Sequence, residues 1–499
     1  MRIPYKYGVL LALMPGITVF LIDATVVNVA LAKLASVFSV QVATVQWAIT
    51  GFALANGVAT PMANFIEKRF TMKRVWLAAL TLFTAASLLC GLAPAFWVLI
   101  LARILQGFAG GMMLPLAIST LFSAFPPNER GLALGTFAIP LVAGPALGPT
   151  VGGYIVTNLD WRLIFFINLP VGVAAVLLGY VFLRPSEAQP DAPFDAFGAV
   201  LSTIGFGAIL YGLSRVSQDG WSSLTVRGLL GTGATSLFML VVWELQQEHP
   251  LIDVRLFLIP RFAIANVVGW VSTVGLFGAE FMLPLYLQNV RGLSAFDTGL
   301  LLLPQGLAIA VGGPIAGRLV DVIGARVVVL VGFTLLAWNT WQLTQITLET
   351  PYSTFTALLV MRGFAFGASL QPTQLVALGS VPANLRTQAS SVNNAMRGVF
   401  QSLGVASLAT VVQTQTSIHA VTLGWQVTPD LVQRIASLGA GANAVLVAAR
   451  EVLAQSAVLA FNDAYRVGFF VTCLAILFAF ALPGRGALRV DPTALMGAE

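Results

Sequence analysis

The chain has 499 residues, of which 58% are hydrophobic and only 9% are charged, whereas a soluble domain carries roughly a quarter charged residues. This balance excludes an ordinary soluble globular protein and predicts a chain whose main solvent is lipid. The formal net charge of +6 does not indicate nucleic-acid binding, because the Lys and Arg residues are scattered through short gaps between apolar runs.

Fourteen apolar segments are long enough to cross a membrane, for which about 20 mostly apolar residues are needed. The first exceeds the apolar region of a signal peptide and contains Asp23, so it is expected to remain as a span. The sequence predicts an all-α polytopic membrane protein. In chain order its spans cover residues 9–31, 45–66, 74–92, 96–121, 131–156, 161–183, 196–214, 226–244, 262–288, 298–317, 327–347, 352–380, 388–414 and 462–482.

Alternate loops carry most of the basic residues, among them residues 68–74 and 318–326. Loops rich in Lys and Arg stay on the cytoplasmic side. Both termini are therefore expected to be cytoplasmic, with the chain in the inner (plasma) membrane.

The two halves of the chain look duplicated, since similar Pro- and Arg-containing loops recur at residues 127–130 and 382–386. Such a repeat predicts a six-helix bundle in each half and a substrate site at the interface between the bundles. The expected division is an N-terminal bundle over residues 1–185, a linker with two inserted helices over 186–250, and a C-terminal bundle over 251–499.

The longest hydrophilic segment covers residues 415–461 and is expected outside the membrane. Its apolar residues recur at helical spacing, which predicts helices. The residues are Leu431, Ile435, Leu438, Val445, Ala448 and Val452. Two interpretations stay open, a segment that packs on its own bundle and a segment that docks a periplasmic partner.

Two stretches carry a family resemblance, LIDATVVNVAL at residues 21–31 and WRLIFFINLP at residues 161–170. They resemble signatures of the fourteen-span drug:proton antiporters of the EmrB/QacA type in the major facilitator superfamily, with Ala32 in place of a final Pro in the first. The resemblance implies the major facilitator fold with two extra central helices, and a monomer. It also implies proton-driven efflux of lipophilic, often cationic, molecules, with a periplasmic adaptor and an outer-membrane channel as candidate partners. Export of an endogenous lipid or secondary metabolite is the alternative.

Asp23 is the first candidate proton-coupling residue. A carboxylate in the hydrocarbon region costs at least a few kcal/mol by insertion scales. Desolvation favours its neutral form and a nearby cation favours its charged form, so a substrate can switch it. The alternative is a hydrogen bond that only fixes the bundle.

Arg103 is the second candidate, in the sequence LARILQG at residues 101–107, which resembles the RxxQG motif of the family. An arginine does not relay a proton at working pH, but it can hold or release a carboxylate. The resemblance makes Arg103 a coupling residue. The alternative is a fixed buried ion pair.

The fifth span contains a run of glycines and prolines. Gly144, Gly148 and Gly152 lie four residues apart on one helix face and allow a neighbouring helix to approach closely, whereas prolines loosen the helix. The run resembles the antiporter motif of the family, which is associated with exporters. Its residues are Gly144, Pro145, Gly148, Pro149, Gly152 and Gly153.

A cytoplasmic gating motif is expected twice, once in each half. The second copy keeps Gly317, Asp321, Gly324 and Arg326, and Asp321 is predicted to cap or pair across a helix end. The first copy keeps Arg69 but has Asn64, Lys68 and Thr71 where the motif has Gly, Asp and Gly, so its latch is in doubt.

Polar residues inside several spans are candidates for substrate binding. Glu280 is predicted to bind substrate or a second proton, or else to lie at a solvated helix end. The two arginines and two asparagines in the later spans either pair with Glu280 or hydrogen-bond across helices. The full set is Glu280, Asn28, Asn393, Asn394, Arg362 and Arg397.

No enzyme or cofactor site is expected. Cys90 and Cys473 lie in apolar runs and offer no metal site. The histidines, His249 and His419, lie in loops, and the chain has no GxxxxGK[ST] sequence for nucleotide. The proton gradient is therefore the expected energy source, since one proton moving down about 150 mV releases roughly 3.5 kcal/mol.

Overall fold

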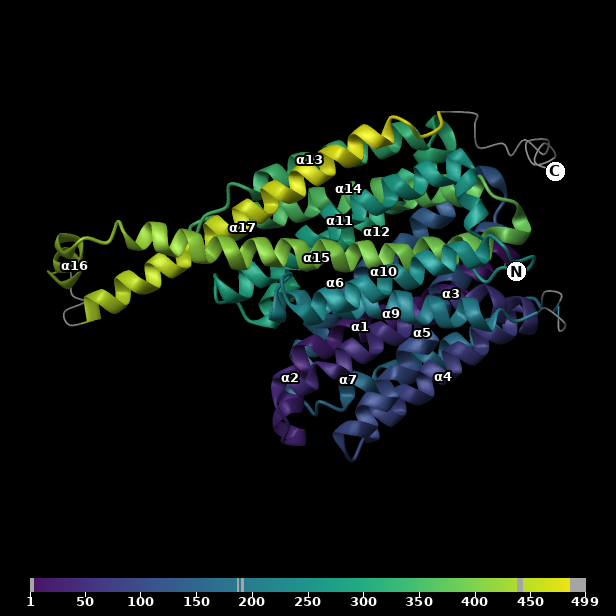
Figure 1. The fold of residues 1–499 in the computed structure, drawn as a ribbon, viewed down its shortest axis with the longest axis horizontal. Coiled ribbons are helices and arrows are strands. Elements are labelled where there is room, and N and C mark those ends of the chain that lie inside the picture. The colour runs from purple at the N-terminus through teal and green to yellow at the C-terminus, as the bar shows by residue number, and fades with distance from the viewer. Residues whose placement is uncertain (1–3, 186–187, 190–192, 438–442, 485–499) are drawn as a thin grey trace.

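The computed structural model describes residues 4–185, 188–189, 193–437 and 443–484. Within these ranges the chain consists of helices and short connections, without a strand. The long helices run side by side along one direction (Figure 1). Because lipid offers no hydrogen bonds to the backbone, helices that satisfy their own N–H and C=O groups suit this apolar sequence.

Eleven helical segments are long and apolar enough to cross a membrane. They are α1 (Tyr5–Phe38), α4 (Met72–Leu92), α5 (Phe96–Ala124), α7 (Leu163–Phe166) together with α8 (Asn168–Phe182), α9 (Ala196–Asp219), α10 (Leu224–Glu244), α11 (Pro260–Asn289), α12 (Ala295–Ile323), α14 (Tyr352–Gly379), α15 (Arg386–Gly424) and α17 (Ala444–Ala479).

Three more helices lie where the second, fifth and eleventh spans are predicted, α3 (Trp47–Phe70), α6 (Arg130–Asn158) and α13 (Ala325–Leu343). The described part of the chain thus has a helix at each of the fourteen predicted positions. The short elements are α2 (Val42–Val45), α16 (Pro429–Ile435), η1 (Pro127–Glu129), η2 (Val254–Leu258) and η3 (Ala383–Leu385).

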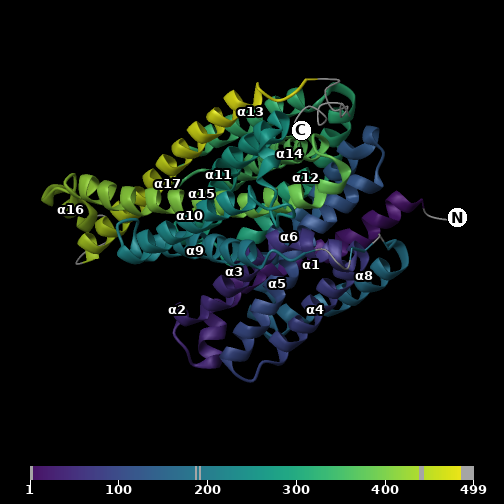
Figure 2. The same ribbon diagram turned by 45° about the vertical axis from the view of Figure 1, so that its right-hand side comes forward.

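The two halves meet along α6 and α12, which approach closely because glycines face each other. A Cβ atom added to Gly135 would lie 2.1 Å from the carbonyl oxygen of Gly313. Away from this contact, α9 packs against α3 of one half and α15 of the other. The inserted helices therefore lie between the halves (Figure 2).

Both ends of the described chain lie at the same end of the molecule (Figure 1), which we call the terminal end. There Lys6 forms an ion pair with Glu129, and Arg326 at the start of α13 donates to the carbonyl oxygen of Leu482. Each of these contacts lies within one half of the chain.

The described residues of the hydrophilic segment at 415–461 are mostly helical, as predicted. Its last residues, including Val458 and Phe461, pack in the core of the C-terminal half. Helix α15 continues to Gly424, past the predicted span 388–414, and α17 begins at Ala444, before the predicted span 462–482. The two helices project beyond the bundle and carry α16 at their tip (Figure 1). We call residues 415–461 the projecting hairpin. The side chain of Leu431 and the whole of Leu438 lie outside the described residues.

Candidate functional site

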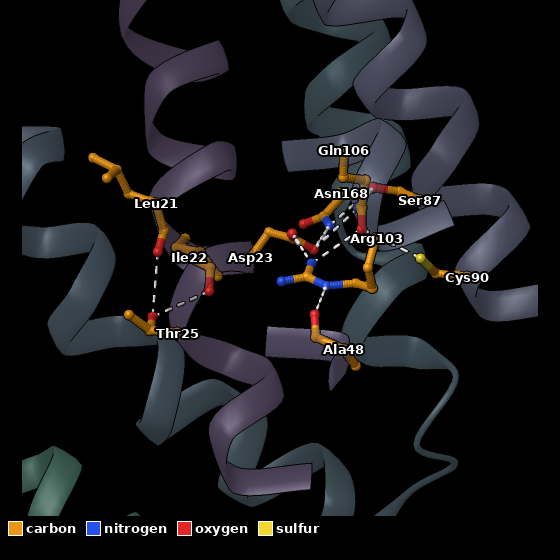
Figure 3. A network of polar contacts seen from close by, with 10 residues as sticks. All are labelled: Leu21, Ile22, Asp23, Thr25, Ala48, Ser87, Cys90, Arg103, Gln106 and Asn168. Atoms are coloured by element: carbon orange, nitrogen blue, oxygen red, sulfur yellow. Dashed lines mark hydrogen bonds and ion pairs between the residues drawn. The ribbon is translucent and has the colours of Figure 1, made fainter. Parts of the chain in front are cut away.

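The Asp23 carboxylate lies at the centre of a polar network inside the N-terminal half (Figure 3). Arg103 Nη1 of α5 donates to Asp23 Oδ2 on α1, and both side chains are 0% exposed. Asn168 Nδ2 donates to Asp23 Oδ1 at 2.7 Å, and Gln106 Nε2 lies 3.3 Å from the same oxygen. A buried charge pair is tolerable only when its remaining hydrogen-bonding groups are satisfied, as they are for this carboxylate.

The Arg103 guanidinium is fixed from three directions. Its Nε donates to the carbonyl oxygen of Ala48 at 3.1 Å, and its Nη1 also donates to Gln106 Oε1 at 3.0 Å. The Phe52 ring centroid lies 4.1 Å from its central carbon, a favourable cation–π distance. Because Ala48 and Phe52 belong to α3, Arg103 links α1, α3 and α5.

Helices α4 and α8 complete this network with residues that the sequence analysis did not assign to the site. Ser87 Oγ accepts from Gln106 Nε2 at 2.7 Å and from Asn168 Nδ2 at 3.1 Å. Cys90 Sγ donates to Gln106 Oε1 at 3.2 Å. Gln106 lies in the RxxQG-like sequence, and Asn168 interrupts an apolar run, which is the signal of a functional polar residue in a span. Ser87 carries no comparable signal.

The glycine face of α6 lies against α1, the helix that carries Asp23. A Cβ atom added to Gly148 would lie 2.0 Å from Thr25 Oγ1, and one added to Gly144 would lie 2.6 Å from the Cβ atom of Leu21. Gly152 meets Val26 in the same way. Gly153 is also buried and Pro149 partly exposed, whereas the side chain of Pro145 lies outside what the structure describes.

A second acid–arginine pair lies in the C-terminal half. Arg362 Nε of α14 donates to Glu280 Oε2 of α11 at 2.8 Å, and Gln305 Nε2 donates to Glu280 Oε1 at 2.8 Å. Arg362 also donates to the carbonyl oxygen of Leu276 at 3.0 Å and to Asn339 Oδ1 at 3.3 Å. The Glu280 side chain is 31% exposed, in contrast to Asp23.

The remaining predicted residues do not join this pair. Asn393 Nδ2 donates to Asn266 Oδ1 at 2.5 Å, and Asn394 Nδ2 donates to the carbonyl oxygen of Ser390 at 2.7 Å. Asn28 is exposed. Of the two arginines that the sequence left unassigned, Arg362 is therefore the partner of Glu280 and Arg397 is not.

Residues 13–405 match the family model of the Major Facilitator Superfamily. The chain belongs to the Major Facilitator Superfamily.

Similar members of this superfamily include proteins named for drug resistance and drug export. The lincomycin resistance protein LmrB of Listeria innocua is 32% identical over 421 residues, which cover 84% of this chain and 89% of that protein. The multidrug export protein EmrB of Haemophilus influenzae is 30% identical over 428 residues, 84% of each chain. The solved structure of the proton:xylose symporter XylE is similar in fold, with a TM-score of 0.62, 15% identity and 96% of each chain covered.

Major facilitator halves are related repeats, and the two ion pairs occupy corresponding helices. Asp23 and Arg103 lie on α1 and α5, the first and fourth long helices of the N-terminal half. Glu280 and Arg362 lie on α11 and α14, the first and fourth of the C-terminal half. The same helix pair is thus joined by an acid and an arginine twice, once with a fully buried acid and once with a partly exposed acid.

The second copy of the cytoplasmic gating motif links the halves at the terminal end. Asp321 Oδ1 and Oδ2 accept from the backbone N–H groups of Gly131 and Leu132 at 3.0 and 3.1 Å. These N–H groups lie in the first turn of α6, where a negative charge is favourable. Gly317 packs on Gly131, and Gly324 ends α12 with a φ of 93°.

The first copy of this motif forms no matching contact through Lys68, and Arg69 is exposed. Instead, the neighbouring residue Glu67 is hydrogen-bonded to Thr387 in the first turn of α15. The Thr387 hydroxyl also lies 2.6 Å from that of Ser119 on α5. Asp321 thus contacts the start of α6, and Glu67 contacts the start of α15. Each contact joins the two halves, although the sequence motif is intact only around Asp321.

Proposed function

We propose that this transporter couples the entry of protons to the export of lipophilic, often cationic, small molecules across the inner membrane. In this proposal the terminal end faces the cytoplasm, as the distribution of Lys and Arg favours. The names of the similar proteins LmrB and EmrB support drug efflux as the activity.

The observation that carries the proposal is the fully buried pair of Asp23 and Arg103. While Asp23 is ionised, the pair ties α1 to α5 through a charge-assisted hydrogen bond. Protonation of Asp23 removes that attraction, and Arg103 keeps its contacts with Ala48, Gln106 and Phe52. The proton therefore changes how strongly α1 is held.

Once the ion pair with Arg103 is lost, α1 can shift along the glycine face of α6. The α1 residues Leu21, Thr25 and Val26 lie against Gly144, Gly148 and Gly152 of α6, which have no side chains to interlock with them. A helix that packs on glycines shifts with less rearrangement than one held by interdigitating side chains. We infer that the proton state of Asp23 sets the position of α1 relative to α6.

Glu280 supplies the charge for a cationic substrate. Its carboxylate is partly exposed, and the neighbouring aromatic ring of Phe277 lies one turn before it on α11. Aromatic faces beside an acid attract flat lipophilic cations. Binding of such a cation competes with Arg362 for the carboxylate.

The projecting hairpin is the proposed docking surface for a periplasmic adaptor. It extends from the end opposite the terminal end (Figure 1). Large apolar side chains are exposed on it, among them Val421, Leu453 and Trp425, which is 84% exposed. These side chains are the candidate contacts of the adaptor in this proposal.

The proposal is tested with energised inverted membrane vesicles, a pH-sensitive dye and a panel of lipophilic cations and neutral drugs. Drugs are expected to dissipate the pH gradient only in vesicles that contain the protein, and not in vesicles with Asp23→Asn. If no compound in the panel does so, the proposal of drug export is wrong.

A further inference from the structure

Arg397 is a cation within α15 that lacks an acidic partner. Among the described residues no carboxylate lies within 4.0 Å of it, and none forms a hydrogen bond with it. Arg103 and Arg362, which also lie well inside predicted spans, are both paired with acids. Because an arginine keeps its charge at any working pH and an unpaired charge in a span is unfavourable, Arg397 calls for an anionic ligand.

The Arg397 side chain lines a small cavity between α11, α14 and α15. The cavity measures about 20 Å³, and one water-sized group needs roughly 10–15 Å³. A carboxylate oxygen fits this space without displacement of the helices. Its polar lining comprises Trp270, Thr273, Thr373, Gln374, Asn393 and Arg397.

Two further donors in this lining have no acceptor. Trp270 Nε1 and Gln374 Nε2 are buried and have no hydrogen-bond partner among the described residues, and the Gln374 side chain is only 5% exposed. An indole N–H donates only, as does an amide NH₂. Since buried donors are normally paired, these two buried donors beside the Arg397 guanidinium indicate an acceptor supplied from outside the chain.

The surroundings of the cavity are aromatic. The Trp270 ring stacks on Phe400 with centroids 5.4 Å apart and planes at 11°. The Phe277 ring centroid lies 5.5 Å from the Arg397 guanidinium carbon. A ligand whose acidic group reaches the donors therefore has its adjoining carbon skeleton against rings, which favours an amphiphilic aromatic acid.

We propose that Arg397, Trp270 and Gln374 bind the carboxylate of a lipophilic substrate, so that the transporter accepts acids and zwitterions besides cations. The proposal deepens the proposed export function and rests on it for the role of the ligand. Glu280 lies ten residues beyond Trp270 on α11, about 15 Å along the helix axis. A zwitterion whose acid reaches the donors at Trp270 would need its amine about this far along α11 to meet Glu280.

The test is calorimetric titration of the purified full chain in detergent, without a proton gradient. The probes share one ring system and differ only in the polar group: naphthalene-2-carboxylate, naphthalene-2-carboxamide and naphthalen-2-ylmethylammonium. The carboxylate is expected to bind at least about tenfold more tightly than the amide, as for a hydrogen bond to a charged group. Arg397→Gln removes this preference, whereas Arg434→Gln, at an exposed arginine of α16, keeps it.

Equal affinity for the carboxylate and the amide would overturn the proposal, as would an unchanged preference in Arg397→Gln. If Arg397→Gln does not fold, Trp270→Phe and Gln374→Met each remove one donor with little change in volume. Both are expected to weaken carboxylate binding several-fold without changing amide binding, and no change in either variant would also overturn the proposal. Because binding is measured without transport, a failure here is distinct from a failure of proton-coupled export.

Discussion

Arg103 donates a hydrogen bond to Asp23 from a helix 80 positions further along the chain, and neither side chain has any exposure. Each charge is therefore stable in this position only because of the other and of the amides around it. The same relationship recurs between Glu280 and Arg362, where the acid is partly exposed. In our proposal the buried pair has the proton-linked role and the partly exposed pair has the substrate-linked role.

Removing one partner of the buried ion pair of Asp23 and Arg103 is expected to destabilise the folded chain. Asp23→Asn leaves the Arg103 charge buried without its counterion, which costs about 3–5 kcal/mol in folding free energy. Arg103→Gln likewise leaves the Asp23 charge buried without its counterion. The double variant is expected to lose less folding free energy than the sum of the losses in the two single variants. Thermal unfolding in detergent measures all three. The exposed pair of Asp430 and Arg434 is the control, with a coupling of about 0–1 kcal/mol.

A side chain on the glycine face of α6 is expected to push α1 away. Gly148→Ala places a Cβ atom 2.0 Å from Thr25 Oγ1 and 3.2 Å from the Ile22 carbonyl oxygen. Such overpacking costs about 1–3 kcal/mol in folding free energy. A lower unfolding temperature and slower export check this. Gly231→Ala, where a Cβ atom meets nothing within 4 Å, is the control; equal effects of the two changes would contradict close packing on α1.

Asp321→Asn is expected to loosen the terminal end. The substitution removes the charge that accepts from the N–H groups of Gly131 and Leu132, and loss of a charge at a helix N-terminus weakens the contact by about 0.3–2 kcal/mol. Hydrogen exchange measured by mass spectrometry should speed up in the first turn of α6. Asp297→Asn, in the first turn of α12, should leave that peptide unchanged; unaltered exchange in Asp321→Asn would disprove the latch.

The projecting hairpin is expected to be dispensable for folding and necessary for an adaptor. Replacing residues 425–443 by a short Gly-Ser linker removes α16 and the tip but leaves the helices within the bundle intact. The unfolding temperature should change little, and co-purification with the adaptor should be lost. Retained co-purification would place the adaptor elsewhere.

Most of the fold could be predicted from hydropathy, because each span must bury its backbone polar groups within one helix. The limits of the helices around residues 415–461 are the exception. Hydropathy marks where a helix leaves lipid and not where the helix ends, so α15 and α17 continue as polar helices beyond the predicted limits.

Asp23 and Arg103 could each be identified as candidates from sequence because charges in spans are rare. Their pairing with each other and with the surrounding amides could not be predicted, since the rotation of each helix is set by its packing. Asn168, the first residue of α8, is one such partner of Asp23. Likewise, the sequence left open whether Arg362 or Arg397 pairs with Glu280, and the structure shows that Arg362 does.

Proton release on substrate binding tests the central claim most directly. Purified protein in weakly buffered detergent solution receives a cationic substrate identified in the vesicle assay, and a pH-sensitive dye records the released protons. The unmodified protein and the exposed-site control Asp430→Asn are predicted to release protons when substrate binds, whereas Asp23→Asn binds the substrate and releases none. Equal proton release from Asp23→Asn would contradict the account, because the coupling proton would then reside on another residue.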